Sequence, residues 1–483
     1  MDLPRKPERV FGRVREWDGL ARFAASPSAD VRLGIVSGRR RQGKTFLLDA
    51  LAEQTGGFFF AATESTERET LERFGRAVAA FAGGGRYAFN NWEEALERLF
   101  AVVGNRLVVL DEFPYLVKAS PSLPSELQRA LDPRGQARVA GSRVLLCGSA
   151  MSVMGGLLAG TAPLRGRASL ELIVKPLDYR QAAQFWGIAD PRLAVLVHSV
   201  VGGTPAYRRE FVAGDAPDSL ADFDSWVLRT VLNPQVPLFR EARYLLAEET
   251  EIRDVALYHA VLGAIAGGNS TRGGIAGAIG RPSTDIGHPL SVLEDSQLIV
   301  READPLTKGK PLYRICEPLL VYYEAIMRRQ WTLLERGYEQ VAWSGSQSTF
   351  LSKVVGPNFE SICRDWALMA GPAIFGDLVG HVASASINDA KSRTQIEVDV
   401  VVLAAEEPGL PKRVLSLGES KWDRVMDVGH VQRLERAREL LAGKGYDVSS
   451  TLLACYSGAG FSPALRARND VLLVDLETLY AAG

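Results

Sequence analysis

The stretch VRLGIVSGRRRQGKTFLLDALAEQ, residues 31–54, decides the fold of the first part of this chain. Residues 31–38 are mainly apolar and end in glycine, which is typical of a short buried strand. From residue 44 onward the apolar residues recur at helical spacing. Between strand and helix, GRRRQGKT (38–45) fits the pattern G-x-x-x-x-G-K-[ST], so the sequence predicts a phosphate-binding loop in its required context.

The residue types in this loop suit the grip of a triphosphate. Gly38 and Gly43 allow a tight turn whose backbone N–H groups point inward, and the following helix adds its positive N-terminal end. Lys44 is expected to reach the β- and γ-phosphates, and Thr45 to ligate Mg²⁺. The predicted nucleotide-contacting residues are Gly38, Arg39, Arg40, Arg41, Gln42, Gly43, Lys44 and Thr45.

Further short apolar runs alternate with amphipathic helices along the same part of the chain. The runs 58–62, 106–113 and 143–149 read as strands, and 69–81 and 91–103 as helices. This alternation predicts an α/β fold with a parallel sheet and helices on both of its faces.

Two acids close the predicted strand LVVLDEF. Asp111 and Glu112 would lie at the carboxyl edge of the sheet, where open parallel sheets bind their ligands. We expect Asp111 to hold Mg²⁺ through water and Glu112 to orient or deprotonate the attacking water. The alternative is an acidic pair that simply faces solvent, and the predicted phosphate-binding loop upstream argues against it.

Other motifs of this region resemble the archaeal-type ATPases of the AAA+/STAND P-loop class over residues 8–330. FGRVREWDGL (11–20) is similar to the opening motif of that family, and VGGTPAY (201–207) to a segment near its nucleotide. The resemblance implies ATP as ligand, a sensor-1 position at Ser149, and trans-acting arginines at Arg165 and Arg167. An arginine acting in trans implies a homo-oligomer, whereas a surface or salt-bridged arginine is the simpler interpretation.

Composition limits the remaining choices. The 483 residues predict two to four domains, with 47% hydrophobic and 23% charged residues, as in ordinary globular proteins. The formal net charge of −1 excludes a histone-like protein that binds nucleic acid through an overall basic surface. Four dispersed cysteines without a C-x-x-C pair favour a reducing compartment, and no run is apolar enough for a membrane helix. A cytoplasmic protein is expected.

The middle of the chain is predicted to be helical. Residues 176–250 suit a helical lid, and 251–331 suggest three short helices followed by a two-stranded wing, the outline of a winged helix-turn-helix. WSGSQS (343–348) reads as a linker.

The charges of the predicted winged helix argue against strong DNA binding. Residues 251–331 hold nine basic and nine acidic residues, and the expected reading helix is acidic. We therefore favour a structural connector over a DNA-reading module. The basic residues that could reach a nucleic-acid backbone are Arg281, Lys308, Lys310 and Arg314.

Residues 355–483 form a second α/β pattern. TQIEVDVVVLA (394–404) alternates, which would put Asp399 and Val401 on one face and Val398 on the other. In RVLSLGESKW (413–422), Glu419 and Lys421 share a face, so an antiparallel hairpin would bring Asp399, Glu419 and Lys421 together. Two carboxylates beside a lysine suit phosphodiester cleavage assisted by Mg²⁺ or Mn²⁺.

This D-x(19)-E-x-K constellation on an αβββαβ pattern resembles the PD-(D/E)xK nuclease superfamily over residues 355–456. It resembles in particular the domain that often follows archaeal-type ATPases. The resemblance implies that Glu360 is an additional acid of the metal site and that Gln432 is a helper residue, with Val398 where the pattern has proline. Arginines that could line a groove are Arg433, Arg436 and Arg438. A surface ion-pair cluster or a degenerate fold used for interaction stays open, because residues 340–483 carry a net charge of −3.

The sequence thus predicts an ATPase core over 1–175, a lid over 176–250, a winged helix over 251–340 and a nuclease-like domain over 350–483. The favoured function is an ATP-dependent protein in which nucleotide state controls a metal-dependent nuclease acting on DNA or RNA. The alternative is a STAND-like switch that binds ATP, changes oligomeric state and recruits a partner through a non-catalytic C-terminal domain. A DNA-binding regulator ranks last on the charge count.

Overall fold

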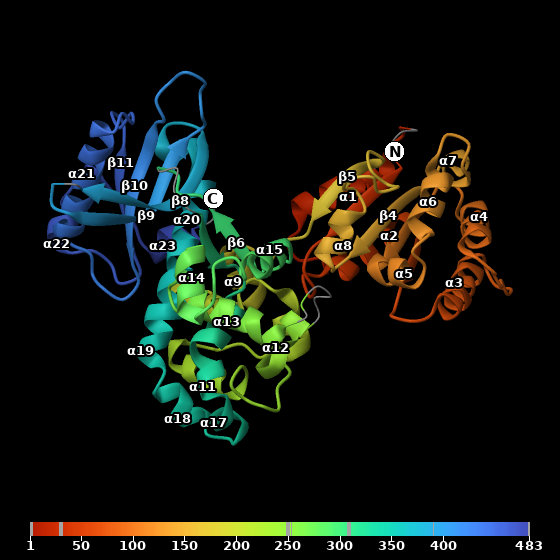
Figure 1. Ribbon diagram of the computed structural model, residues 1–483, viewed down its shortest axis with the longest axis horizontal. Coiled ribbons are helices and arrows are strands. Elements are labelled where there is room, and N and C mark those ends of the chain that lie inside the picture. Colours follow the sequence, from red (N-terminus) through yellow and green to blue (C-terminus); the bar gives the residue numbers. More distant parts are fainter. Residues whose placement is uncertain are drawn as a thin grey trace. The chain divides into compact units, whose positions relative to one another are not determined.

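A computed structural model describes residues 3–28, 32–247, 252, 254–306, 311–389 and 391–481 (Figure 1). The chain divides into two compact units. The first unit comprises Met1–Pro176, Thr204–Ala206 and Asp295–Gln297. The second unit comprises Leu177–Gly203, Tyr207–Glu294 and Leu298–Gly483.

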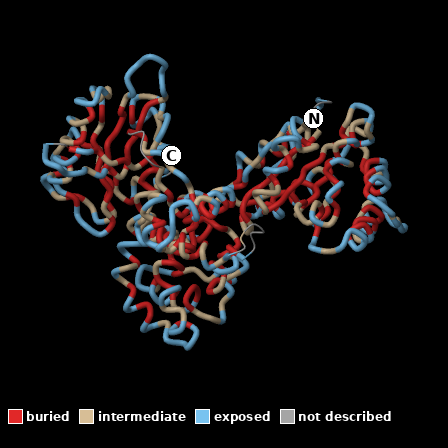
Figure 2. Tube along the Cα trace, viewed as in Figure 1, coloured by how far each residue is buried: buried red, intermediate tan, exposed pale blue. Residues whose placement is uncertain are grey.

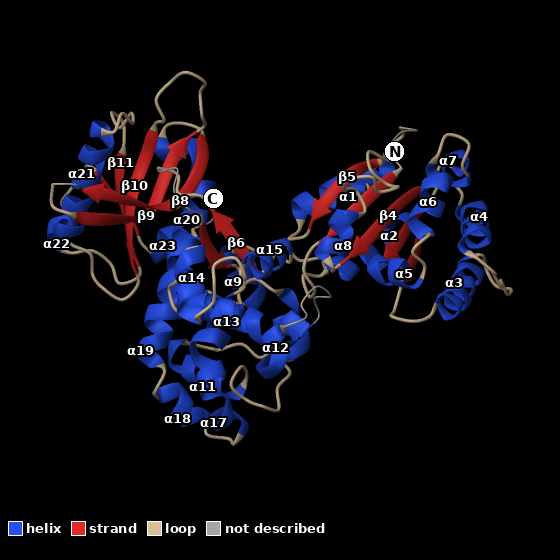
Figure 3. Cartoon of the chain, viewed as in Figure 1, coloured by secondary structure: helices blue, strands red, loops and turns tan. Residues whose placement is uncertain are grey.

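The first unit is built on a five-stranded parallel sheet, which confirms the predicted fold class of this part (Figure 3). The strand order is β2-β3-β4-β1-β5, so β1 lies between β4 and β5. The edge strand β5 was not predicted, because its residues alternate between half-buried and exposed instead of forming an apolar run. The strands are β1 (Leu33–Ser37), β2 (Phe58–Ala61), β3 (Leu107–Asp111), β4 (Arg143–Gly148) and β5 (Ala168–Ile173).

Helices cover both faces of this sheet, as expected. One apolar core joins α1 and α2 to the sheet, and a second core on the other face joins α3 to α6 to it (Figure 2). The helix α3 begins earlier than predicted because Thr66 and Glu69 form a capping box. The helices are α1 (Val14–Ala25), α2 (Lys44–Thr55), α3 (Glu67–Phe81), α4 (Trp92–Val103), α5 (Phe113–Ala119), α6 (Leu123–Leu131), α7 (Gln136–Ala140) and α8 (Met151–Gly156).

The predicted strand 106–113 is too long. Strand β3 ends at Asp111, and Phe113 already begins helix α5. Between them Glu112 adopts a left-handed backbone conformation with φ of 50°. Such a sharp strand-to-helix turn cannot be read from an apolar run.

The second unit starts with a helical region. The last three helices of this region, α13 to α15, and the antiparallel pair β6–β7 follow the order predicted for a winged helix. Lys308 and Lys310 lie outside the described residues. The elements are α9 (Tyr179–Trp186), α10 (Pro191–Val201), η1 (Tyr207–Phe211), η2 (Leu220–Asp222), α11 (Phe223–Arg229), α12 (Leu238–Ala247), α13 (Val255–Ala266), α14 (Arg272–Ile279), α15 (Gly287–Asp295), β6 (Ile299–Glu302) and β7 (Leu312–Ile315).

The predicted linker 343–348 is wrong. It lies in a run of short helices, and Trp343 is buried, with its indole N–H donating to Asp224 at 3.0 Å. The ring also packs against Phe350 at 5.1 Å between centroids, so these residues belong to a core. The elements here are α16 (Pro318–Tyr322), η3 (Tyr323–Met327), η4 (Arg328–Gln330), α17 (Trp331–Glu335), α18 (Glu339–Ser344), α19 (Gln347–Thr349) and η5 (Phe350–Val355).

The chain ends in a mixed five-stranded sheet of order β12-β11-β10-β9-β8. Strands β8, β9 and β10 are antiparallel neighbours, and β10, β11 and β12 are parallel. Helix α21 packs into the apolar core on one side of the sheet, and α20 also contacts β8, β9 and β10. The elements are α20 (Gly356–Phe375), β8 (Val379–Asp389), β9 (Thr394–Ala404), β10 (Val414–Lys421), α21 (Val428–Gly443), β11 (Leu452–Ser457), α22 (Pro463–Arg466), β12 (Val471–Val474) and α23 (Leu476–Tyr480).

The predicted face pattern of β9 is wrong beyond Asp399. Opposite β8, Val398 pairs with Ala385 and Val401 with Ala383, so β9 has one extra residue between these pairs. Val398 and Val401 consequently pack into the same core, whereas a regular strand would put them on opposite faces. Such a β-bulge re-aims the side chains around it, and Asp399 lies within it.

Among the described residues, no helix combines the length and apolarity that a membrane crossing requires.

Gly203→Ala should destabilise the second unit. A Cβ at Gly203 would lie 1.9 Å from the carbonyl oxygen of Leu177, and Gly203 also accepts the backbone hydrogen bond of Leu177. We expect the free energy of unfolding to fall by about 1–3 kcal/mol. Calorimetry of the full chain would show this loss as a lower unfolding temperature. Gly277→Ala, in a helix with open space, should instead stabilise by about 0.5–1 kcal/mol. Equal unfolding temperatures for both variants would contradict the packing described.

Candidate functional site

The loop between β1 and α2 has the backbone of a phosphate cradle. Gly38 has φ of 145°, and a Cβ there would lie 2.4 Å from the carbonyl oxygen of Val174. Gly43 has φ of 81°, and Arg41 adopts φ of 67° although it is not glycine. The two predicted glycines are therefore required by the turn, and Arg41 adds a strained position of the kind that clusters at functional sites.

Lys44 is buried at the first position of α2. Its Nζ donates hydrogen bonds to the carbonyl oxygens of Gly38 and Arg39, at 2.6 and 2.7 Å. Burial lowers the pKa of Lys44 and the nearby Arg40 lowers it further, while the carboxylates of Asp111 and Glu112 oppose the shift. Thr45, the next residue, is exposed.

Asp111 offers an unused carboxylate oxygen to this site. The side chain is buried, and Oδ1 accepts a hydrogen bond from the backbone N–H of Glu112 at 2.9 Å. Oδ2 is buried without a hydrogen-bond partner in the described part of the chain. A buried, unsatisfied carboxylate oxygen is costly, and a hydrated cation would satisfy it.

Glu112 and Ser149 interact directly across the ends of β3 and β4. The Ser149 hydroxyl lies 3.3 and 3.2 Å from the two carboxylate oxygens of Glu112, to which it donates. The structure thus brings Asp111, Glu112 and Ser149 to the loop that holds Lys44, as the sequence predicts for a nucleotide site.

Arg13 is a supporting residue whose role sequence reasoning missed. Its guanidinium donates to the backbone oxygens of Lys175 and Gln42, at 2.6 and 3.0 Å, and so fixes the loop from outside. The Gln42 side chain in turn donates to Thr204 at 3.2 Å. Arg13 lies in the motif FGRVREWDGL (11–20) and Thr204 in VGGTPAY (201–207), but only the fold shows what these two residues contact.

The two predicted trans-acting arginines have local partners here. Arg167 forms an ion pair with Asp132 at 2.8 Å, and the exposed Arg165 donates to the carbonyl oxygen of Gly160 at 2.5 Å.

A second cluster lies on β9 and β10 of the C-terminal sheet. Gly418 pairs with Val400, so the next residues outward, Glu419 and Asp399, oppose each other in the predicted hairpin. Lys421 Nζ lies 2.7 Å from Glu419 Oε1 and 3.9 Å from Asp399 Oδ2. The backbone N–H and hydroxyl of Ser420, a residue not predicted, donate to Asp399 Oδ2 at 2.8 and 3.1 Å.

Glu419 has one carboxylate oxygen in use and one without a hydrogen-bond partner. Its side chain is 2% exposed, and Oε1 is shared between Lys421 and Arg433, the latter at 3.3 Å. Oε2 is buried and has no hydrogen-bond partner among the residues described. Burial, followed by the charge of Glu419, raises the pKa of Asp399.

Glu360 joins the cluster from α20. Burial and the nearby Asp399 carboxylate raise the pKa of Glu360 to about 7, although 38% of its side chain is exposed. Arg364 lies 3.8 Å from Glu360 and donates to the backbone oxygen of Asp399 at 3.0 Å.

The three predicted metal ligands of this domain, Glu360, Asp399 and Glu419, do not form a complete metal-binding site. Within the described ranges, no group of three or more His, Cys, Asp or Glu side chains is arranged to hold a metal ion. Mg²⁺ in proteins is commonly held by one or two carboxylates together with water, and the opposed Asp399 and Glu419 with an unused Oε2 fit that requirement.

The other basic and polar residues predicted near this site differ in their surroundings. Gln432 is exposed on α21, Arg436 pairs with Asp389 and Glu439, and Arg438 is half-buried. In the winged-helix region, Arg281 is exposed, whereas Arg314 pairs with Glu302 and donates to Ser361.

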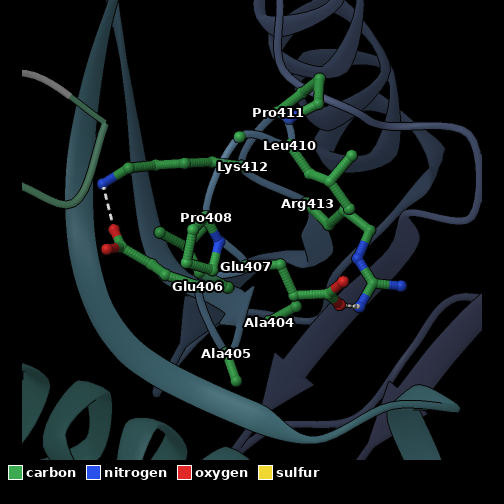
Figure 4. Close-up of a pocket in the computed structure, with 11 residues that line it drawn as sticks. Ala404, Ala405, Glu406, Glu407, Pro408, Leu410, Pro411, Lys412 and Arg413 are labelled. Atoms are coloured by element: carbon green, nitrogen blue, oxygen red, sulfur yellow. Dashed lines mark hydrogen bonds and ion pairs between the residues drawn. The ribbon is translucent and has the colours of Figure 1, made fainter.

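A hollow of about 410 Å³ lies within the loop that joins β9 to β10 (Figure 4). Ion pairs of Glu406 with Lys412 at 2.7 Å and of Glu407 with Arg413 at 3.0 Å brace this loop. The hollow is lined by residues 403–413 and contains none of the predicted site residues.

Comparison with known proteins gives distant likenesses. No family model matches the sequence. The uncharacterized protein MJECL04 of Methanocaldococcus jannaschii is 26% identical over 308 residues, which is 63% of this chain and 66% of that protein. The chain thus spans slightly less than two thirds of that relative.

Two solved structures are similar at low identity. The Walker-type ATPase PABY2304 of Pyrococcus abyssi has 19% identity and a TM-score of 0.49, covering 67% of this chain and 98% of that one. The ORC2 protein of Aeropyrum pernix has 15% identity and a TM-score of 0.41, covering 72% and 97%.

The raised pKa of Glu360 predicts a specific pH dependence of stability. Because the fold favours the protonated carboxyl, its contribution is present below the unfolded pKa of 4.5 and is lost as pH rises through about 7. Glu360→Gln should therefore gain stability relative to the wild type across this range, measured as urea midpoints. An exposed glutamate variant, Glu335→Gln, should track the wild type. A constant offset between Glu360→Gln and wild type would contradict the shift.

Proposed function

We propose that the first unit binds ATP with Mg²⁺ and hydrolyses it. The observation that carries this proposal is that the buried Lys44, in a glycine-bounded loop after β1, and the unsatisfied Asp111 Oδ2, at the end of β3, lie at the same edge of the sheet. A cation-bearing loop and a free carboxylate oxygen at one sheet edge match the two halves of a Mg²⁺–triphosphate ligand.

The roles of the residues follow from their positions. The backbone N–H groups of the loop and Lys44 would bind the phosphates, with Thr45 and Asp111 holding Mg²⁺. When bound, the ion would neutralise charge developing on the phosphate oxygens. Glu112, oriented by Ser149, would accept a proton from the attacking water. Arg165 or Arg167 could contribute in trans only if the chain forms a homo-oligomer and their present partners release them.

Lys44→Ala should abolish nucleotide-induced thermal stabilisation. Lys44 supplies the buried positive charge, and its loss removes the group expected at the β- and γ-phosphates. The measurement is the shift in unfolding temperature on adding MgATP. For the wild type, a hundredfold excess of ligand over Kd corresponds to about 2.7 kcal/mol of added stability. The control Lys118→Ala removes a surface lysine paired with Glu64 and should keep the wild-type shift. An undiminished shift in Lys44→Ala would rule out the assigned loop.

We further propose that the C-terminal part cleaves phosphodiester bonds in DNA or RNA with Mg²⁺ or Mn²⁺. Asp399 and Glu419 would hold the ion, Lys421 would orient the water or offset charge, and Glu360 would assist from α20. The unused Glu419 Oε2 and the bulge that fixes Asp399 support this interpretation. The ion, when bound, would activate the attacking water.

One observation favours the second candidate, a STAND-like switch with a non-catalytic interaction domain. Glu419 is already paired with Lys421 and Arg433, which is how a structural ion-pair network is built. In that case the first unit would still bind ATP, and the C-terminal domain would recruit a partner.

We further infer that the two activities are coupled, and contacts within each unit support this inference. In the first unit the loop residue Gln42 holds Thr204, and in the second unit α10, just before Gly202, is tied to α20. Burial lowers the pKa of His198 to about 4, so its neutral ring can donate to Asn358 at 3.1 Å. Asn358 is two residues from Glu360. The chain segment 198–204 therefore joins the two networks covalently.

Lys421→Ala and Glu419→Gln should each lose nuclease activity by about 100-fold or more, since each removes part of the metal and charge arrangement. The assay uses plasmid, single-stranded DNA and RNA with Mg²⁺ or Mn²⁺, with and without ATP. Lys412→Ala, a surface lysine paired with Glu406, should remain active. If wild type and Lys421→Ala are equally inert on every substrate, the nuclease proposal fails and the switch is favoured.

A further inference from the structure

Arg314 lies on the wing strand β7 and reaches the C-terminal domain. Its Nη1 donates a hydrogen bond to the hydroxyl of Ser361 on α20 at 2.8 Å, while its Nη2 pairs with Glu302 on β6. The loop after β6 is held by the same domain, because Leu306 packs into its core and accepts a hydrogen bond from the Tyr446 hydroxyl. The wing is therefore packed against the C-terminal domain within the second unit.

The contacts of Ser361 continue toward the acid cluster. Arg364, on the same helix, donates from Nη2 to the Ser361 hydroxyl at 3.3 Å and from Nη1 to the backbone oxygen of Asp399 at 3.0 Å. Asp399 lies in the bulge of β9, and a bulge sets the direction of the side chains around it. A continuous row of contacts therefore joins the wing to a proposed metal ligand. Its members are Glu302, Arg314, Ser361, Arg364 and Asp399.

The polar character of this row has a cost. The Nε of Arg314 is buried without a hydrogen-bond partner among the described residues. Burial lowers the pKa of Arg364, and the charge of Arg314 lowers it further, so the two guanidiniums repel each other where both donate to Ser361. Apolar side chains of similar size would support a purely structural contact at a lower cost. Directed hydrogen bonds instead fix an orientation, and the backbone of Asp399 receives one from Arg364.

We propose that Arg314 is a positioning residue of the C-terminal site. Through Ser361 and Arg364 it holds the bulge of β9, so that Asp399 can share a divalent ion with Glu419. The wing thereby serves the acid cluster of its own chain, and Arg314 touches neither the ion nor the substrate. This inference rests on the metal-dependent site proposed for the C-terminal part.

The first measurement is the binding of Mn²⁺ to the full chain without nucleotide. The part of this binding that is lost in Glu419→Gln reports the C-terminal site. Arg314→Ala should weaken that part about 10-fold, because a displaced Asp399 is a poorer ligand. Arg314→Lys should lie between Arg314→Ala and the wild type, because it keeps the charge without the planar fork.

The second measurement separates positioning from substrate binding. In the nuclease assay Arg314→Ala should lower kcat about 10-fold and leave KM for the nucleic acid unchanged. Ser361→Ala should have the same effect, and the double variant should lose no more than the more affected single variant, because the two residues act in series. Arg301→Ala is the matched control. Arg301 is exposed on β6 and precedes Glu302, so it faces the other side of the wing and should behave as wild type.

Unchanged Mn²⁺ affinity and kcat in Arg314→Ala would overturn the inference, as would additive losses in the double variant. A raised KM with a weaker salt dependence in both Arg301→Ala and Arg314→Ala would also overturn it, since the wing would then bind the nucleic-acid backbone.

Failure of the proposed function gives a different result. If the wild type binds Mn²⁺ through Glu419 but cleaves no substrate, the nuclease proposal fails and the Mn²⁺ affinities alone decide the role of Arg314. Without Glu419-dependent Mn²⁺ binding, the positioning role falls. Unfolding temperatures without metal show which variants are folded, and Arg314→Lys and Ser361→Ala carry the test if Arg314→Ala does not fold.

Discussion

The buried ammonium of Lys44 is the charge on which the site of the first unit depends. Two loop carbonyl oxygens satisfy it, and no carboxylate forms a hydrogen bond with it in the described structure. Carbonyl dipoles hold a buried cation less well than an anion does, which is why burial lowers the pKa of Lys44. The surrounding fold therefore keeps a buried positive charge whose direct hydrogen-bond acceptors in the described structure are carbonyl oxygens, with the carboxylates of Asp111 and Glu112 near enough to act on it.

Backbone strain surrounds the same site. Arg41 and Glu112 both adopt left-handed conformations without being glycine, and Arg13, which fixes the loop, does so as well. Each such residue costs about 1–3 kcal/mol, so the packed sheet and its two helical layers must hold them in place.

The sequence could predict whatever depends on local pattern. The parallel sheet, the loop 38–45 and the hairpin of β9 and β10 follow from apolar periodicity and from spacing. The Gly and Ser residues around Trp343 predict a linker, but the partner of its indole, Asp224, is distant in sequence. Ser420 and Arg314 act through contacts that only the folded chain creates, and the bulge in β9 depends on pairing with β8. Such non-local contacts have no periodic signature.

The two candidate sites share a buried carboxylate oxygen without a partner but differ in how their charges are balanced. Near Asp111, the ammonium of Lys44 is hydrogen-bonded to carbonyl oxygens, so both a positive group and a carboxylate oxygen are available to a ligand. At Glu419 two cations already occupy Oε1, and Glu360 holds its proton up to a pH of about 7. A divalent ion there would displace Lys421 or Arg433 and the proton of Glu360 together. Ion binding at the second site should therefore strengthen with pH.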